Sequence, residues 1–482
     1  MRQAPTDRTG GAARNGLRAD VAAAGAALLL VAAAIAVGWW LNRRHVPIYA
    51  GSAPLFATPG PHVGIGTVLA PLVAAAVVGW LPRLADRLGW RRLLLTAYVA
   101  ALAWILSLAM IDGWRDGLTS RLTGDAEYLI DVPGVTDIPV MLRTFTDRIL
   151  DFQPDSWHTH VSGHPPGALL VFVVLDRIGL GGGTAAALLC VLVGALTAVA
   201  VPVTLRALGD EPAARAVLPF VVLFPGAVWL GASADAIFAG VTATGIAALA
   251  VAGRRRGPVL AAGALLGYGV FLSYGLVLMA PIALVPALVS RRLRATLFAL
   301  AGAVAVVAVF AAAGFWWYDG YRLVVERYYQ GIGRERPYAY WVWANLATLV
   351  LAAGPATAPI LRRAVVALGP AAPGEPGGAG WDGRGGGSGA PRHARPAPPG
   401  AVRRFLGRLS TGPVALPLAA VVAIVAADLS GLSKAEVERI WLPFGVWLMA
   451  GAALLPARHR RWWLVAQAVT ALAVNHLVLT VW

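Results

Sequence analysis

The sequence of 482 residues contains one cysteine, Cys190, and one lysine, Lys434, and only 13% of its residues are charged. A single cysteine inside an apolar run excludes a disulfide framework and a cysteine-ligated metal site. Soluble proteins carry about 25% charged residues, so an ordinary soluble domain is excluded as well. Apart from Lys434, all forty basic residues are arginines, which is typical of a GC-rich genome. The net charge of +16 therefore does not indicate a nucleic-acid partner, and we expect none.

The sequence is instead rich in long apolar segments. Apolar residues make up 58% of the chain, and many runs reach the roughly 17–25 residues that a helix needs to cross a bilayer. We therefore predict an all-α polytopic membrane protein with about 13 transmembrane helices. The predicted spans are 21–40, 64–81, 93–112, 184–205, 214–232, 235–252, 258–272, 275–289, 295–315, 341–361, 413–428, 441–456 and 463–481. The first is too long for a cleaved signal peptide, so we expect it to remain in the protein.

The charged residues are distributed unevenly between the two sides of these spans. If the N-terminus is cytoplasmic and the spans alternate, the inner segments hold 27 Arg and Lys against 7 Asp and Glu, a net charge of +20. The outer segments and span ends hold 13 and 17, a net charge of −4. Basic residues accumulate on the cytoplasmic side of membrane proteins. We therefore predict a multi-pass plasma-membrane protein with a cytoplasmic N-terminus and its functional site on the outer face.

One apolar segment does not fit this alternation. The stretch WHTHVSGHPPGALLVF (157–172) leads into Pro165–Ile178, which is too short for an ordinary span. If it crossed the bilayer, every later basic loop would lie outside. We predict a short or re-entrant helix that returns to the outer face, which is tolerated where protein buries it.

Four parts follow from these patterns. Residues 1–92 hold the N-terminus and two helices, 93–361 form a membrane core, 362–412 are a cytoplasmic loop, and 413–482 carry the C-terminal helices. Within the cytoplasmic loop, the Gly, Pro and Arg-rich residues 370–400 should be disordered. Within the core, the long outer loop 113–164 contains a helix-period run, VMLRTFTDRILDF (140–152), which predicts a helix on the membrane surface.

Side chains that could do chemistry gather on the predicted outer side. Asp125 and Glu127 lie beside Tyr128, and a partly desolvated carboxylate can serve as a general base. Asp235, between two apolar spans, is costly unless it is paired or functional. Arg439 has the planar fork of donors that suits a phosphate, although an arginine at a span end also often only anchors the interface.

Three histidines, His158, His160 and His164, lie within seven positions. A His-x-His pair in extended chain would point to one face and could bind a divalent cation. The spacing dictates no fourth ligand, however, so it does not favour a metal, and no cofactor is expected. Contact with a phosphate or a sugar hydroxyl is the more typical use of such imidazoles.

Together these features resemble the GT-C superfamily of integral-membrane glycosyltransferases. The resemblance spans roughly residues 93–456 and rests on a span, an acidic GDAEY opening the outer loop, then GHPPGALLVF, AAALLCVLVGALTAVAVPVTLRALG and SADAIFAGV. Members include protein O-mannosyltransferases, aminoarabinose transferases, and cell-envelope mannosyl- and arabinosyltransferases. The resemblance implies transfer of a hexose or pentose from a polyprenyl-phosphate donor to a glycan, lipid or protein acceptor of the cell envelope. It does not account for residues 1–92 or for the 370–400 insertion.

The resemblance also implies roles for particular residues. Asp125 would be the base, with Glu127 as second choice, and the sugar would be transferred with inversion. Arg439 would hold the lipid phosphate, with Lys434 and Arg336 behind it. The other predicted substrate-binding residues are His158, His160, His164, Tyr128, Asp235 and Glu438.

The sequence is compatible with two other functions. A transporter or lipid flippase would usually place ionisable residues near the bilayer midplane, often in internal repeats. Here the acids gather at one face and no repeat is evident. A scaffold within an envelope-assembly complex would not require acids and an arginine on one surface. The sequence therefore favours the glycosyltransferase.

Overall fold

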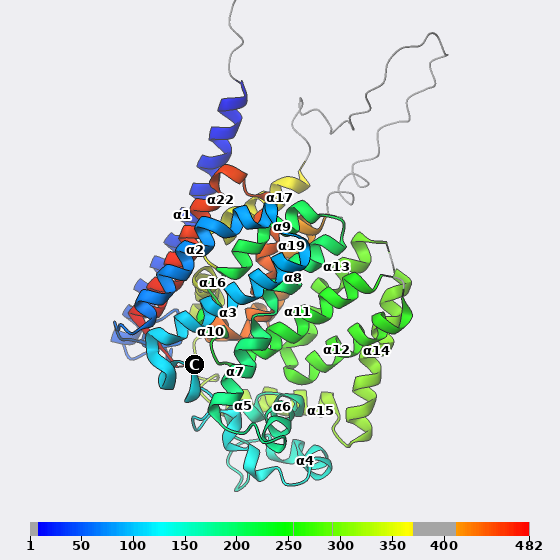
Figure 1. Cartoon of the computed structure of the whole chain (residues 1–482). Helices are drawn as coiled ribbons and strands as arrows, with labels where there is room; N and C mark the ends of the chain where they lie inside the picture. The colour runs from blue at the N-terminus through cyan, green and yellow to red at the C-terminus, as the bar shows by residue number, and fades with distance from the viewer. Residues whose placement is uncertain (1–7, 254, 292, 370–410, 482) are drawn as a thin grey trace, which may run out of the picture.

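The computed structural model describes residues 8–253, 255–291, 293–369 and 411–481. Over these ranges the chain is predominantly helical and has two three-residue strands, which confirms the predicted all-α membrane protein (Figure 1). Within them, seven helices are long and apolar enough to cross a membrane, or eight if one bent pair counts as a single span. Three shorter apolar helices, Arg256–Leu272, Tyr274–Val289 and Leu442–Leu454, add to these. The predicted spans thus coincide largely with helices, but several are short or broken.

The helices of the first half of the chain are α1 (Arg8–Arg43), α2 (Gly66–Arg87), α3 (Trp90–Trp114), α4 (Ile138–Thr144), α5 (Thr159–Ser162), α6 (Pro166–Arg177), α7 (Gly183–Gly194), α8 (Thr197–Ala207), α9 (Glu211–Val222), α10 (Ala227–Leu230) and α11 (Ala234–Ala252). Those of the second half are α12 (Arg256–Leu272), α13 (Ala280–Val289), α14 (Leu293–Ala312), α15 (Trp317–Gln330), α16 (Tyr338–Ala353), α17 (Thr357–Leu368), α19 (Gly412–Leu429), α20 (Val437–Ile440), α21 (Leu442–Gly445) and α22 (Ala457–Leu477). Short 3-10 or π turns are η1 (Arg115–Thr119), η2 (Tyr128–Ile130), η3 (Val132–Gly134), η4 (Thr146–Arg148), η5 (Tyr274–Met279) and η6 (Val446–Leu454). The strands are β1 (Ala57–Pro59) and β2 (Val478–Thr480).

Small residues allow these helices to pack closely. α11 packs against α7, α8 and α12, and α12 packs against α14. A Cβ atom on Gly240 would lie 2.0 Å from the Val193 carbonyl oxygen, and one on Gly263 would lie 1.9 Å from that of Ala299. Glycine at such contacts lets membrane helices approach backbone to backbone. The many glycines and alanines of the apolar runs therefore hold the bundle together.

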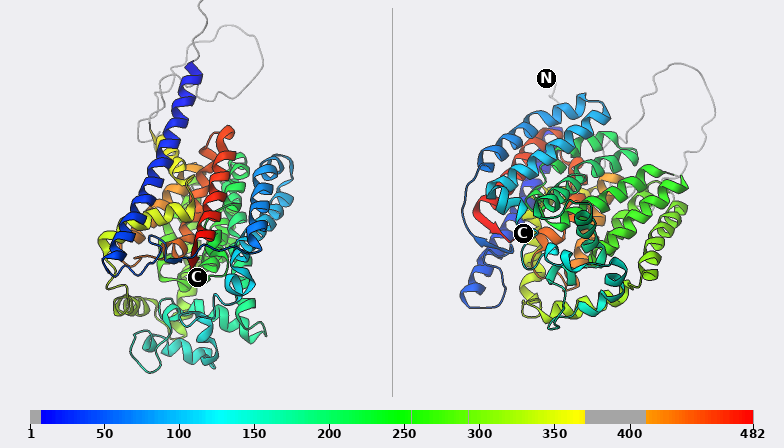
Figure 2. Two further views of the ribbon diagram at one scale, coloured as in Figure 1. Left: turned by 90° about the vertical axis from the view of Figure 1, so that its left-hand side faces the viewer. Right: turned by 60° about the horizontal axis from the view of Figure 1, so that its bottom comes forward.

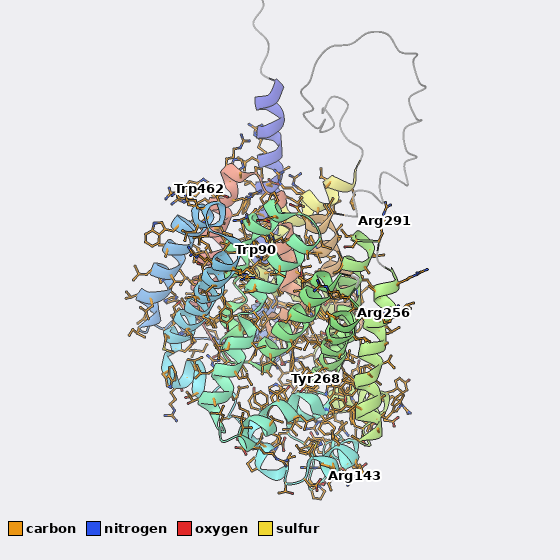
Figure 3. The ribbon with its side chains drawn as sticks, turned by 45° about the vertical axis from the view of Figure 1, so that its right-hand side comes forward. Trp90, Arg143, Arg256, Tyr268, Arg291 and Trp462 are labelled. Carbon is orange, nitrogen blue, oxygen red and sulfur yellow. The ribbon has the colours of Figure 1, made fainter. Side chains whose placement is uncertain are left out.

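A layer of short helices covers one end of the bundle. Figure 1 places α4, α5, α6 and α15 there, whereas α1 begins at the opposite end, and both views of Figure 2 agree. In Figure 3, Arg143 lies in this layer, at the opposite end from Arg291 and Trp462. The predicted outer loop and the predicted cytoplasmic segments thus lie at opposite ends. α6 is a short helix, as predicted, and packs against α7 and α12.

The predicted span over 341–361 is not one continuous helix but a bent pair of helices. α16 and α17 meet at a bend of 102°, where Gly354 has a φ of +83°. The backbone groups freed by the bend are hydrogen-bonded to Gln467, whose Nε2 donates to the Ala353 carbonyl at 2.8 Å. Its Oε1 accepts from the Ala356 amide at 3.3 Å. A break in a membrane helix is tolerated where protein satisfies its backbone in this way.

Two other expected helices end early. The predicted span 463–481 is helical only to Leu477, after which β2 pairs antiparallel with β1. The predicted surface helix over 140–152 is reduced to α4 and the η4 turn. The chain folds back there because Phe145 is fully buried and its carbonyl accepts a hydrogen bond from the Trp157 indole. The predicted disorder of 370–400 concerns residues outside those that the structure describes.

Candidate functional site

The start of the outer loop places Glu127 inside the protein. The backbone N–H of His160 donates to the Ala126 carbonyl at 2.9 Å and so joins α5 to this loop. Glu127 is only 6% exposed, and its Oε1 lies 3.1 Å from Nδ1 of His160. The ring of Tyr128 stacks on that of His160 with centroids 5.9 Å apart. Three predicted site residues therefore lie together.

Arg439 on α20 joins this group to the rest of the protein. Its Nη2 lies 2.9 Å from Nε2 of His160, and its Nη1 donates to Oδ2 of Asp235 at 2.8 Å. A guanidinium can only donate, so Nε2 of His160 accepts and the ring proton sits on Nδ1, facing Glu127. Asp235 lies in the first turn of α11, where the helix dipole also favours a negative charge. A continuous buried line therefore runs from Glu127 through His160 and Arg439 to Asp235.

A strained turn brings Glu436 into the same network. Ala435 and Glu436 have φ angles of +71° and +64°, which cost a non-glycine residue roughly 1–2 kcal/mol each. The turn aims the Glu436 carboxylate between Arg439, at 3.0 Å, and Arg336, at 3.0 Å. Burial opposes the charge of Glu436, but the two guanidinium groups outweigh it and lower the pKa of this carboxyl. Strain of this kind typically persists at functional sites.

Arg336 and Lys434 support this turn from the other side. Arg336 is 4% exposed, and its Nη1 donates to the Lys434 carbonyl at 2.8 Å. The Lys434 ammonium donates to the Gly333 carbonyl at 2.9 Å, so it holds the loop rather than joining the network of Arg439. Asn345 donates to Asp428 and to the Ser433 carbonyl and fixes the base of the same loop.

The connection between α1 and α2 also reaches the site. The backbone N–H of Phe56 donates to Oε1 of Glu438 at 2.8 Å, from 382 positions away in sequence. Burial raises the pKa of Glu438 to about 7. Residues 1–92, which the family resemblance leaves unexplained, therefore contribute directly to the walls of the site.

The three histidines do not converge on one point. His158 bonds Asp131, to whose carboxylate it is held by its backbone N–H at 3.1 Å and its Nδ1 at 2.9 Å. Nδ1 of His164 donates to the His160 carbonyl at 2.7 Å, and burial lowers the pKa of His164 to about 4. Among the described residues, no three His, Cys, Asp or Glu side chains are grouped to hold a metal ion.

A cavity of about 400 Å³ opens beside this network. Asp125 and Glu127 line it together with Asp112, Asp116 and Arg121, and β2 contributes the facing wall. Asp125, the first predicted base, is exposed, and its carboxylate makes no hydrogen bond or ion pair with any described residue. Asp125 therefore lies in the cavity but outside the network. The side chain of Glu127 lines the cavity and also contacts His160, so it links the two.

The outer clusters of acids in the sequence include Glu436 and Asp131, but sequence reasoning gave neither a role at the site, and it did not single out Phe56. A signal for Glu436 was present, because it precedes Arg439 by three positions, a spacing at which side chains meet on a helical turn. Nothing in the sequence connects Phe56 with Glu438, or Asp131 with His158, because only the folded chain brings these residues together.

Comparison with known proteins adds little at the sequence level. No protein-family model and no curated protein matches the chain. Among solved structures, it is similar to the crystal structure of the Archaeoglobus fulgidus oligosaccharyltransferase in complex with zinc and sulfate, with a TM-score of 0.46 and 14% sequence identity. The similarity covers 80% of this chain and 53% of that one, so the chain spans about half its length. A likeness at this level is too low to assign a function.

Proposed function

We propose that this chain is an integral-membrane glycosyltransferase of the GT-C type, which moves a sugar from a polyprenyl-phosphate donor to an acceptor hydroxyl on the outer face of the plasma membrane. One observation carries the proposal: the buried line from the cavity through Glu127 and His160 to Arg439 and Arg336. It places the carboxylates of the cavity at one end and two guanidinium groups, which pair with Asp235 and Glu436, at the other. A base on one side of the sugar and cations on the other is the arrangement that such a transfer requires.

The reaction needs both ends. The acceptor oxygen attacks the anomeric carbon, its proton passes to a carboxylate, and the bond from that carbon to the phosphate oxygen breaks with inversion. A carboxylate in the cavity serves as the base. The phosphate leaves with growing negative charge, which preorganised guanidinium groups stabilise most where water is excluded. Arg439 and Arg336, both buried, meet that condition.

Within the cavity, we propose Asp125 as the base and Glu127 as the residue that connects it to the arginines. The carboxylate of Asp125 has no partner among the described residues and is free to accept a proton, whereas Glu127 is engaged with His160. The cavity is large enough for a sugar residue, and the acceptor would enter it between the acidic loop and β2.

Transfer in reconstituted membranes tests the proposal. Purified protein is supplied with polyprenyl-phosphate-linked sugars and extracts of envelope glycans and lipids, and mass spectrometry detects the product. We expect Asp125→Asn to abolish transfer while the variant stays folded; full activity would move the base to Glu127. Activity that survives a chelator would exclude a metal requirement. Movement of lipid or solute across the membrane without any product would favour a flippase or transporter instead.

A further inference from the structure

A short two-stranded sheet forms the wall of the cavity that faces its carboxylates. β1 and β2 pair antiparallel, and two further backbone hydrogen bonds, at 3.1 and 3.0 Å, extend the pairing as far as His62. We call residues 57–62 and 476–481 the strap. The strap residues that line the cavity are Leu479, Thr480 and Val481. Both strands lie outside residues 93–456, the part of the chain that resembles the GT-C superfamily.

Arg121 fastens the strap to the outer end of α3. Its Nη1 donates to the Thr480 carbonyl at 2.7 Å and to the Thr480 hydroxyl at 3.1 Å, and its Nη2 lies 3.4 Å from Oδ2 of Asp112. The other oxygen of Asp112 lies 3.0 Å from Nε2 of His62, whose Nδ1 donates to the Gly60 carbonyl at 2.8 Å. One largely buried ion pair, between Arg121 and Asp112, therefore holds both chains of the strap.

The same contacts leave the cavity without a cation for an anionic ligand. Arg121 is the one base among the described residues that line it, and both Nη atoms of Arg121 are engaged. The carboxylates of Asp116, Asp125 and Glu127 line the same space. A cleft lined by one sign of charge attracts the opposite sign and repels its own. An acceptor that carries a carboxylate or phosphate group would therefore be repelled.

The two walls of the cavity differ in polarity. The carboxylate oxygens on one wall accept hydrogen bonds, and sugar hydroxyls can donate them. Leu479 and Val481 share one face of the opposite wall, since alternate residues of a strand point to the same side. Both are partly exposed, at 44% and 49%. A sugar ring matches this arrangement, because it has hydroxyl groups on its edge and an apolar C–H face.

We propose that the strap selects the acceptor: with the carboxylates that face it, the strap admits a sugar that carries no anionic group, and Arg121 is its positioning residue. This rests on the proposed function, in which the cavity receives the acceptor. Because the strap lies outside the region of family resemblance, the choice of acceptor is a property of this chain and not of the superfamily.

The selection by charge can be measured without any sugar. Ser120, which lines the cavity, is replaced by cysteine in the full-length protein, whose own Cys190 is buried. The rates of reaction with trimethylammonium-ethyl and sulfonato-ethyl methanethiosulfonate, which differ in the sign of their charge, are then compared. Thr144→Cys, at an exposed position of α4, is the control. We expect the ratio of cationic to anionic rates to be roughly 10-fold higher for Ser120→Cys, and equal ratios overturn the selection by charge.

Sugar transfer tests the role of the strap. The envelope extract is separated on an anion exchanger, and product should form from the neutral fraction. Arg121→Gln should raise the acceptor concentration that gives half-maximal transfer by roughly 10-fold, as expected for one charge-assisted hydrogen bond. The maximal rate should change much less, and Arg121→Lys should recover part of the loss. Arg322→Gln, at an exposed position of α15, should behave as wild type does.

Product from the acidic fraction alone overturns the proposal. A lower maximal rate of Arg121→Gln at an unchanged half-maximal concentration removes the positioning role of Arg121. If Arg121→Gln does not fold, Leu479→Ala takes its place and should raise the half-maximal concentration several-fold; an unchanged concentration contradicts the role of the strap. Absence of any product, with the expected labelling ratio, refutes the glycosyltransferase, whereas transfer with equal labelling ratios refutes only the selection by charge.

Discussion

Replacing Arg439 by methionine should destabilise the protein far more than the loss of an ordinary ion pair. The side chain is buried, and its removal leaves the buried carboxylate of Asp235 without its cation, whereas Glu436 keeps its ion pair with Arg336. Burial alone lowers the pKa of Arg439, but Asp235 and Glu436 outweigh it and raise the pKa, so the group is firmly charged. Removing one partner of a buried pair costs about 3–5 kcal/mol. We expect a loss of this size for Arg439→Met.

The Asp235→Asn substitution tests whether the loss of stability in Arg439→Met comes from the uncompensated charge of Asp235. Alone it should cost about 1–3 kcal/mol, because Arg439 keeps Glu436 and His160. In the double variant with Arg439→Met, the unpaired charge of Asp235 is gone, so the two losses should not add and the coupling should reach about 2 kcal/mol. Arg206→Met is the matched control, because its pair with Glu211 at 2.9 Å is largely exposed and should be worth less than about 1 kcal/mol.

The free energy of unfolding can be measured in detergent micelles by titrating in a denaturing detergent and following tryptophan fluorescence, since the chain has 18 tryptophans. Additive losses in the double variant would refute the idea that Asp235 and Arg439 form one charge-compensated unit. An equal loss of unfolding free energy for Arg206→Met and Arg439→Met would show that burial does not increase the contribution of the ion pair to stability.

Two further predictions concern stability. Burial raises the pKa of Glu438 from near 4.5 to about 7, so the folded protein retains a proton that the unfolded chain releases, and the stability that this group contributes should fall as the pH rises from 4.5 through 7. A shift of this size corresponds to up to roughly 3 kcal/mol, so the melting temperature of Glu438→Gln relative to wild type should rise between pH 5 and pH 8; a constant difference would contradict the assignment. Gly263→Val should separate α12 from α14, because its Cβ would lie 1.9 Å from the Ala299 carbonyl oxygen. A melting temperature equal to that of Gly257→Val, where the added Cβ meets nothing within 4 Å, would contradict this packing.

Local chemistry explains which features could be predicted. In lipid, every backbone polar group must find a partner within the protein, and a helix supplies these partners within its own segment, so long apolar runs become helices. The short helix α6 follows from the length of its run, and the clustering of acids and Arg439 at one side follows from the order of the spans. The positions at which helices break could not be predicted in the same way. The bend at Gly354 exists because Gln467, more than a hundred residues later, supplies partners for the freed backbone groups.

The sequence by itself determined the class of the protein, the approximate position of its helices, and the residue types that could do chemistry. Only the tertiary structure decided which of them meet. Asp235 and Arg439 pair across 204 positions and Phe56 reaches Glu438 across 382, and no local pattern records such contacts. For the same reason, the sequence alone does not show that Asp125 lies outside the buried network and that Glu436 lies within it. Periodicity and charge act along the chain, whereas a site depends on which helices pack together.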